Sequence, residues 1–343
     1  MTGHVVITGA SAGVGRATAN AFAAEGWRVT LLAREPARLA AAAAEAEREG
    51  GTALSLPTDV ADAAAVEAAA AEAERSQGPI DVWVNSAMVT VYSPVARITP
   101  EEYRRVTEVT YLGQVYGAMS ALKRMRPRNR GTIVNVSSAL AYHGLPLQAA
   151  YCGAKFAARG FTESLRSELL HEGSRVRVSL VVLPAVNTPQ FDWARNKMPH
   201  RPRPVPPVFQ PEPVAAAILE AAETAPRELV LGRSSLKLLA GSMAAPGLVD
   251  RILAEKGPPG QQDEEPAQER PDNLFEPMPG EFGAHGRFDH EARSSLGRVR
   301  MGNVRAASAA IGAAIFAGMA AAAYTIGRRS ADSASASRQE LMP

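Results

Sequence analysis

Thr8-Gly-Ala-Ser-Ala-Gly-Val-Gly15 separates a short apolar run, residues 4–8, from an Ala-rich stretch with helical spacing, residues 14–26. The three glycines allow a tight turn, a close approach of the backbone to a pyrophosphate, and close packing of a helix on a strand. A helix that begins here also presents free N–H groups to phosphates. A glycine-rich turn alone could be a plain tight connection. The strand before it and the helix after it are what predict a nucleotide-binding loop.

The same alternation of short apolar runs and Ala-rich stretches continues to about residue 232. It predicts strands at residues 4–8, 28–33, 52–57, 82–85, 132–137, 176–183 and 228–231. It predicts helices at residues 14–26, 36–50, 61–77, 100–126, 149–172 and 212–225, with one or two more over 234–256. Strict alternation of strand and helix is typical of a parallel sheet with helices on both faces. We therefore predict a doubly wound, Rossmann-like α/β domain with a mainly seven-stranded parallel sheet and a C-terminal extension.

The overall composition excludes several classes of protein. With 343 residues, of which 46% are apolar and 21% charged, the chain has an ordinary globular composition. A formal net charge of +2 with scattered basic residues argues against a nucleic-acid partner. The single cysteine, Cys152, excludes an intramolecular disulfide and a Cys-built metal site, and we expect no metal. The first residues enter an apolar strand with no basic head, so we expect no secretory signal and a cytoplasmic protein.

The segment Tyr151-Cys-Gly-Ala-Lys155 lies in a predicted helix and carries a pattern that suits proton transfer. A free tyrosine, with a pKa near ~10, holds its proton too tightly to act as a base at neutral pH. Residues four apart share a helix face, so the Lys155 ammonium would favour the Tyr151 phenolate. Ser138, at the end of the fifth predicted strand, would hydrogen-bond a substrate oxygen. A Tyr and a Lys at this spacing occur by chance in many helices, so this prediction depends on Ser138 and the glycine loop.

Six motifs, in order along the chain, resemble those of the short-chain dehydrogenases/reductases. They are Thr-Gly-x-x-x-Gly-x-Gly at 8–15, Asp59-Val60, Asn85-Ser-Ala87, Ser138, Tyr151-x-x-x-Lys155 and Pro184-Ala-Val-Asn-Thr188. The resemblance covers about residues 3–232. It implies hydride transfer between a nicotinamide cofactor and a carbonyl or secondary alcohol, with Tyr151 as general acid/base beside Ser138 and Lys155.

The resemblance also implies where the cofactor binds and how copies of the chain associate. The expected cofactor-binding residues are Gly9, Ser11, Gly13, Val14, Gly15, Arg34, Asp59, Val60, Asn85, Tyr151, Lys155 and Thr188. In this family Asp59 and Val60 would contact adenine, Lys155 the ribose hydroxyls, and the loop at Thr188 the nicotinamide carboxamide. A homo-oligomer formed through the helices at 100–126 and 149–172 is expected on the same basis.

The choice between NAD and NADP depends on the end of the second predicted strand. An acidic residue there would bind the ribose 2′-OH of NAD and repel a 2′-phosphate. The sequence reads Leu31-Leu-Ala-Arg34 instead, and Arg34 could hold a phosphate bidentately, with Ser11 adding a hydroxyl. The other interpretation of Arg34 is an exposed loop charge. We expect NADP(H).

The sequence also departs from the family pattern. The family's asparagine that supports a proton-relay water is replaced by Thr110, whose hydroxyl is shorter and lacks the amide geometry. Ser86, Met88 and Ala185 replace an Asn and two glycines of the family motifs. Because Ser138, Tyr151 and Lys155 are intact, we expect an active enzyme with a modified relay.

The loop over residues 188–212 occupies the position of the family's substrate lid. It offers aromatic and apolar side chains for a hydrophobic substrate and cations for an anionic one: Phe191, Trp193, Met198 and Phe209, and Arg195, Lys197, Arg201 and Arg203. Alternatively, these side chains simply pack on the body of the domain. His143 could line the substrate pocket or be an ordinary polar loop residue. No substrate follows from these residues.

The chain is expected to continue beyond its NADP-binding catalytic domain, residues 1–256. Residues 257–300 are rich in Pro, Gly and acidic residues and predict a flexible linker or a draped extension. Residues 301–329 predict an Ala-rich helix in which 306–326 carry no charge. Such a helix would be ~30 Å long, the thickness of a bilayer core, so residues 306–326 could anchor the cytoplasmic protein to a membrane. Alternatively, this helix docks on a partner subunit or is an Ala-rich low-complexity tail. Residues 330–343 are expected to be disordered.

Two other functions remain open from the sequence. One is a non-catalytic NADP-binding sensor or scaffold on the same fold, for which Thr110 would be a sign of decay. The other is a sugar-nucleotide epimerase or dehydratase, which the glycine spacing and the small substrate region disfavour.

Overall fold

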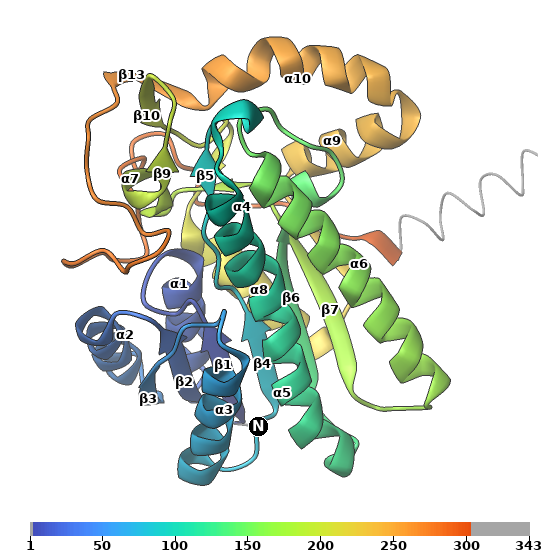
Figure 1. Cartoon of the computed structure of the whole chain (residues 1–343). Helices are drawn as coiled ribbons and strands as arrows, with labels where there is room; N and C mark the ends of the chain where they lie inside the picture. Colours follow the sequence, from blue (N-terminus) through green and yellow to red (C-terminus); the bar gives the residue numbers. More distant parts are fainter. Residues whose placement is uncertain (1–2, 303–343) are drawn as a thin grey trace, which may run out of the picture. The chain divides into compact units, whose positions relative to one another are not determined.

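The computed structural model describes residues 3–302 and has one large, mainly parallel sheet (Figure 1). Its strands are β1 (His4–Thr8), β2 (Arg28–Ala33), β3 (Thr52–Pro57), β4 (Val82–Asn85), β6 (Thr132–Ser138), β7 (Arg177–Leu183), β12 (Glu228–Leu231) and β14 (Arg298–Arg300). They lie in the order β14-β12-β7-β6-β4-β1-β2-β3, and the pairs from β3 through to β12 are parallel. The doubly wound α/β fold is therefore confirmed.

The sheet has eight strands, one more than the seven predicted from the sequence. The additional strand, β14, is the short segment Arg-Val-Arg at residues 298–300. Three residues of which two are charged form neither an apolar run nor an alternating pattern, so no strand is predicted there.

The long helices lie close to their predicted positions. They are α1 (Gly13–Ala24), α2 (Pro36–Arg48), α3 (Ala63–Gln77), α4 (Pro100–Thr107), α5 (Gly113–Arg128), α6 (Ala149–His171), α8 (Pro211–Thr224), α9 (Arg233–Ala244) and α10 (Pro246–Gly260). The single helix predicted over 100–126 is divided into α4 and α5 by a π turn, η2 (Glu108–Leu112). Shorter elements at the edge of the sheet are β5 (Val91–Tyr92), η1 (Val95–Arg97), η3 (Ala139–Ala141), β8 (Ala185–Val186), α7 (Gln190–Trp193), β9 (Arg195–Asn196), β10 (His200–Pro202), β11 (Val208–Phe209) and β13 (Gln262–Pro266).

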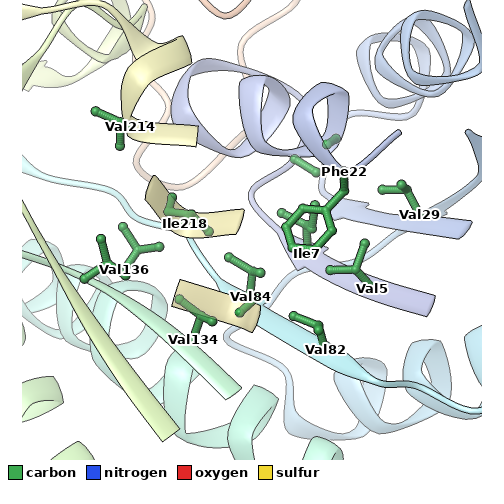
Figure 2. Close-up of a cluster of buried hydrophobic side chains, with 14 of the residues drawn as sticks. Val5, Ile7, Phe22, Val29, Val82, Val84, Val134, Val136, Val214 and Ile218 are labelled. Atoms are coloured by element: carbon green, nitrogen blue, oxygen red, sulfur yellow. The ribbon is translucent and has the colours of Figure 1, made fainter. Parts of the chain in front are cut away.

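Each face of the sheet is covered by helices. Successive side chains of a strand point to opposite faces, so in β1 Val5 and Ile7 join one core cluster and Val6 joins the other. Figure 2 shows the first cluster, in which Phe22 of α1 and Ile218 of α8 lie over valines from the strands. The second cluster is built with α3, α5 and α6. Burial on both faces explains why the strands are continuously apolar.

The segment after α10 runs along the body of the domain (orange in Figure 1). We call residues 262–297 the C-terminal strap. It begins with β13, which pairs antiparallel with β10. Leu274 is fully buried in the second core cluster, and Phe288 is buried in a third cluster with Tyr92 and Phe191. A segment whose composition predicts no packed core is thus anchored by a few apolar residues.

The C-terminal expectations fall largely beyond the described part of the chain. The predicted hydrophobic stretch at 306–326 and the tail at 330–343 lie outside residues 3–302. Within that range, no helix combines the length and the apolar character needed to cross a membrane.

Candidate active site

A cavity of about 380 Å³ opens where the strands of the sheet end at their carboxyl side. Ligands of open α/β sheets bind at this edge. Twelve of the predicted site residues line this one cavity: Gly9, Ser11, Gly13, Val14, Gly15, Arg34, Asp59, Val60, Ser138, Tyr151, Lys155 and Thr188. Residues distant in the sequence are therefore brought together as expected for a single site.

The glycine loop needs its glycines for two different physical reasons. Gly9 has φ +70°, a left-handed conformation that favours glycine. Gly15 has no room for a side chain, because a Cβ would lie 2.2 Å from the Gly9 carbonyl oxygen. A Cβ on Gly13 would lie 3.2 Å from Cβ of Thr188, so it would narrow the space between the loop and the segment after β7. The loop thus brings bare backbone and the start of α1 to the cavity.

Ser138, Tyr151 and Lys155 gather at the other end of the cavity. Ser138 ends β6, and its Oγ accepts a hydrogen bond from Leu140 N at 3.1 Å. Tyr151 and Lys155 lie in the first turns of α6, with the Lys155 Nζ 5.6 Å from the centre of the Tyr151 ring. The Lys155 Nζ donates to Val136 O at 2.9 Å. Helix geometry therefore places the ammonium and the phenol side by side, as their spacing predicts.

Burial shifts the proton affinities of both groups toward the neutral form. It raises the pKa of Tyr151 well above the usual range, although a hydrogen bond with Ser138 acts in the opposite direction. It lowers the pKa of Lys155 from 10.5 to about 7. The Cys152 thiol between them is also buried, and burial raises its pKa, so it is an inert spacer. Strongly shifted groups that face a cavity are typical of catalytic sites.

Two residues expected near the chemistry lie elsewhere. Asn85 is fully buried and does not border the cavity. Its amide bonds Trp83 Nε1 (2.8 Å), Gln114 O (3.1 Å) and Asn135 Oδ1 (2.9 Å), which places it behind the sheet edge. His143 pairs with Asp250 at 3.0 Å and is outside the lining, as a polar loop residue would be.

The substrate loop uses most of its side chains for packing. Phe191, Met198 and Phe209 are at least nine-tenths buried, and only Phe191 also lines the cavity. Trp193 lines the cavity and packs its ring against Phe282 of the strap. All four cations of the loop have carboxylate partners: Arg195 with Glu102 and Asp272, Lys197 with Glu102, Arg201 with Asp192 and Glu265, and Arg203 with Glu291. The packing interpretation therefore describes this loop better than an anion-binding lid.

The end of the cavity near Arg34 is closed by the strap. Arg34 donates to Phe275 O at 2.7 Å and to Asn273 O at 2.5 Å. Arg38 donates to Met278 O at 3.0 Å, and Arg16 to Phe282 O at 2.9 Å. In the glycine loop, Gly13 N donates to Gly283 O at 3.1 Å. Asn273, Pro277 and Met278 line the same cavity, so the strap forms one of its walls.

The sequence reasoning missed this wall and the arginines that hold it. Arg38 lies in the first turn of α2, four residues after Arg34, so the sequence did offer a second arginine close to the predicted one. Arg105 bridges Asp59 and the strap, because it pairs with Asp59 at 2.6 Å and donates to Leu274 O at 3.0 Å. The acceptors on the strap are main-chain carbonyls, which every residue carries, so no residue pattern marks them.

A nicotinamide dinucleotide fits these residues. The glycine loop leaves a backbone cradle that a Cβ at Gly13 would fill, and Asp59 and Val60 line the cavity beside Arg34. Ser138, Tyr151 and Lys155 line the same cavity beside Thr188. One elongated ligand could therefore extend from the strap end to the Tyr151 end.

Comparison with known proteins gives a consistent result. Residues 3–199 match the family model described as short chain dehydrogenase. The chain is 32% identical to an uncharacterised oxidoreductase, YxnA, of Bacillus subtilis over 79% of this chain and 77% of that protein. It is 31% identical to a 3-dehydrosphinganine reductase of Danio rerio over 63% of this chain and 67% of that one. It is 32% identical to an uncharacterised oxidoreductase of Staphylococcus saprophyticus over 56% and 78% of the two chains.

Proposed function

The chain belongs to the short-chain dehydrogenase family, and from that premise we propose that it transfers hydride between NADP(H) and a carbonyl or secondary alcohol, with Tyr151 as general acid/base. The observation that carries the proposal is that Ser138, Tyr151 and Lys155 line the same cavity as the glycine loop. A proton donor and a cofactor loop that shared no cavity could not act on one substrate.

The proton step is assigned to the Tyr151 hydroxyl. When bound, the nicotinamide supplies or accepts the hydride at the carbonyl carbon. Tyr151 donates its proton to the substrate oxygen during reduction and removes it again during oxidation. Ser138 hydrogen-bonds the same oxygen and holds it within reach of the phenol. The Lys155 ammonium, close to the ring, stabilises the phenolate that remains.

The preference for NADP is proposed from Arg34 and its surroundings. No acidic residue stands at the end of β2, and Arg34 follows that strand and lines the cavity. Arg38 also lines the cavity and adds positive charge along the same wall. The strap carbonyls that accept from Arg34 are neutral, so they orient the guanidinium without cancelling its charge.

The proposed substrate is apolar next to the reacting carbon. Outside the cofactor motifs and the strap, the cavity is lined by several apolar side chains, among them Met88, Leu140, Leu145, Val205, Leu238 and Leu253. The cation there, Arg203, is neutralised by two contacts of 2.8 Å with Glu291. These features support a ketone with an apolar chain. Among the similar proteins, the Danio rerio reductase is named for 3-dehydrosphinganine, which makes that ketone a reasonable member of a substrate panel.

NADPH oxidation with a panel of apolar ketones and aldehydes tests the proposal. Tyr151→Phe should lower kcat at least about 100-fold while NADPH still binds, because only the proton donor is lost. Tyr142→Phe is the matched control, since the Tyr142 ring contacts Arg159 and does not line the cavity. NADPH binding without turnover of any substrate by the wild type would instead favour the non-catalytic sensor.

We also propose that copies of the chain associate through α5 and α6. Met119 of α5 and Phe156 and Leu170 of α6 are exposed apolar side chains, which supports an interface there. Sedimentation of the wild type and of Phe156→Ser would test this proposal, with the variant expected to shift toward the monomer.

A further inference from the structure

A π turn lies behind the proposed catalytic lysine. η2 (Glu108–Leu112) joins α4 to α5 and packs against α6, the helix that carries Lys155. A π turn closes wider hydrogen-bonded rings than an α-helix does and is frequent at functional sites. The residues in and just after η2 are therefore candidates to support the lysine.

Thr110, within this turn, is committed to a different partner. Its hydroxyl donates to Val89 O at 2.8 Å and accepts from Val89 N at 3.0 Å, and the residue is fully buried. The only proton of the hydroxyl is thus used to clamp the segment after β4. Thr110 replaces the family's relay asparagine in sequence position, but its contacts are those of a structural clamp.

Gln114, one turn later in α5, differs from Thr110 because one of its side-chain polar atoms has no partner among residues 3–302. It is 2% exposed, and its Nε2 donates to Val136 O at 3.0 Å. The carbonyl can only accept, so this contact fixes which end of the amide is nitrogen. No donor among residues 3–302 reaches the Gln114 Oε1. A buried acceptor without a donor is unfavourable, and a bridging water is its usual partner.

Gln114 and Lys155 meet at the same carbonyl. Val136 O accepts from the Gln114 Nε2 at 3.0 Å and from the Lys155 Nζ at 2.9 Å. The ladder between β4 and β6 ends at the pair Asn85 and Asn135, one residue before Val136. The side chains of α5 and α6 thus converge on the carbonyl just past the end of β4.

The position of Gln114 is itself fixed by two close contacts. Asn85 Nδ2 donates to the main-chain oxygen of Gln114 at 3.1 Å. Gly117, in the next turn of α5, has no room for a side chain, because a Cβ would lie 2.2 Å from Asn85 Oδ1. The missing side chain lets α5 approach β4 closely enough for the amide of Gln114 to reach Val136.

We propose that Gln114 is the positioning residue for Lys155: its Nε2 fixes the Val136 carbonyl to which the lysine donates, and its Oε1 holds the lysine's ammonium through a bridging water. The inference rests on the proposed catalytic role of Lys155. The residue that supports Lys155 is thus Gln114, and not Thr110 at the family's relay position.

The electrostatic surroundings make Lys155 sensitive to such an acceptor. Burial lowers its pKa to about 7. Its neighbour Tyr151 interacts with two further titratable groups, the phenol of Tyr92 and the thiol of Cys152, and burial raises the pKa of all three. All three are neutral near pH 7, so none supplies a countercharge. A neutral oxygen that accepts from the ammonium therefore favours its charged form.

Lysine NMR can test the inference without any substrate. The chain has five lysines, at positions 123, 155, 197, 237 and 256, so ¹³C-labelled lysine gives few signals. The Lys155 signal is identified by its loss in Lys155→Met. Gln114→Leu should lower the pKa of Lys155 by about one unit, because a hydrogen bond to the charged form is removed. Gln114→Glu, which keeps an oxygen in place, should leave it at or above the wild-type value.

Thr110→Val is the decisive comparison, since it removes the hydroxyl at the family's relay position. It should leave the Lys155 titration unchanged. With an apolar ketone and NADPH, Gln114→Leu should lower kcat about tenfold and change KM by no more than about twofold. The alkaline limb of the pH profile of kcat should move to lower pH in this variant. A shift in Thr110→Val but not in Gln114→Leu would overturn the inference, as would a lowered pKa in both position-114 variants. Loss of turnover in the wild type would count against the proposed function alone, because the NMR titration remains readable.

Discussion

The two ends of the cavity are built from different parts of the chain. At the reaction end, side chains of defined chemistry, Ser138, Tyr151 and Lys155, come from β6 and α6. At the strap end, arginines of the body donate to main-chain carbonyls of the strap. The reaction end thus depends on residue identity, and the strap end on the path of the backbone. Substitutions at the reaction end should therefore change turnover, and substitutions at the strap end should change cofactor binding.

Lys155→Met should give the largest effect, a loss of turnover of about 1000-fold, with NADPH binding reduced far less. The same variant should raise the free energy of unfolding, because burial lowers the pKa of Lys155 from 10.5 to about 7. Between these values the folded state binds fewer protons than the unfolded state, so wild-type stability rises with pH. The advantage of the variant should be a few kcal/mol below pH 7 and vanish above about pH 10.5.

Urea unfolding at pH 6 and pH 10 measures this difference. Lys123→Met is the matched control, because the side chain of Lys123 is 69% exposed and should change stability by less than about 1 kcal/mol. An equal effect of the two variants at both pH values would show that burial of Lys155 carries no penalty.

Arg34→Ala should weaken NADPH binding about 30-fold and NADH binding only slightly, because charged hydrogen bonds to a 2′-phosphate are worth about 2 kcal/mol. Fluorescence titration with both cofactors measures the ratio. Arg48→Ala, on the exposed end of α2, serves as the control. Equal losses for both cofactors would mean that Arg34 only anchors the strap, and the proposed preference for NADP would fail.

Gly286→Ala tests the strap as a wall of the cavity. A Cβ there would lie 2.5 Å from Thr188 O, so the strap must move away from the segment after β7. We expect cofactor to dissociate about tenfold faster while the proton step is unchanged. Gly283→Ala is the matched control on the same strap, because no atom lies within 4 Å of its added Cβ. Stopped-flow release that is equally fast in both variants would argue against a retaining wall.

His285→Gln should give the smallest effect. Partial burial lowers the pKa of His285, but hydrogen bonds with Glu212 and Asp289 outweigh it and raise the pKa overall. The stabilisation is therefore fully present below pH 6.5 and is lost as the pH rises through the raised value. Since these side chains are 41–60% exposed, the variant should lose less than about 1 kcal/mol at pH 5.5 and nothing at pH 9. Urea unfolding compares it with His290→Gln, an exposed histidine on the same strap; equal losses would remove any role for the pair of carboxylates.

The sequence predicted those parts of the molecule whose signals are local. Apolar runs between helical stretches predicted the seven long strands of the sheet, β1, β2, β3, β4, β6, β7 and β12, and the glycine spacing predicted the loop before α1. The predicted reaction-end residues do line one cavity. Local patterns could not predict that Thr110 would hydrogen-bond to Val89, because that contact joins two segments that come together only in the fold. The same applies to Asn85, whose side chain faces Gln114 and Asn135 and not the cavity.

The strap was the hardest part to predict. Its Pro-, Gly- and acid-rich composition gives no periodic signal, and its buried anchors, Leu274 and Phe288, are isolated apolar residues in a polar segment. Long-range contacts of this kind depend on the arrangement of the finished domain and not on the neighbours in sequence.

The carbonyl acceptors on the strap have a consequence for how this chain can vary. Replacing Phe275 or Met278 changes a side chain but keeps the oxygen that Arg34 or Arg38 binds. Most of the segment from 273 to 283 can therefore drift in sequence without loss of these bonds. The restricted positions of the strap are its buried anchors, Leu274 and Phe288, and the two glycines where backbone shape is critical, Gly280 with φ +100° and the crowded Gly286. Related chains could keep this wall with little residue identity along it, and two isolated apolar residues and two glycines at matching distances would be its most durable trace.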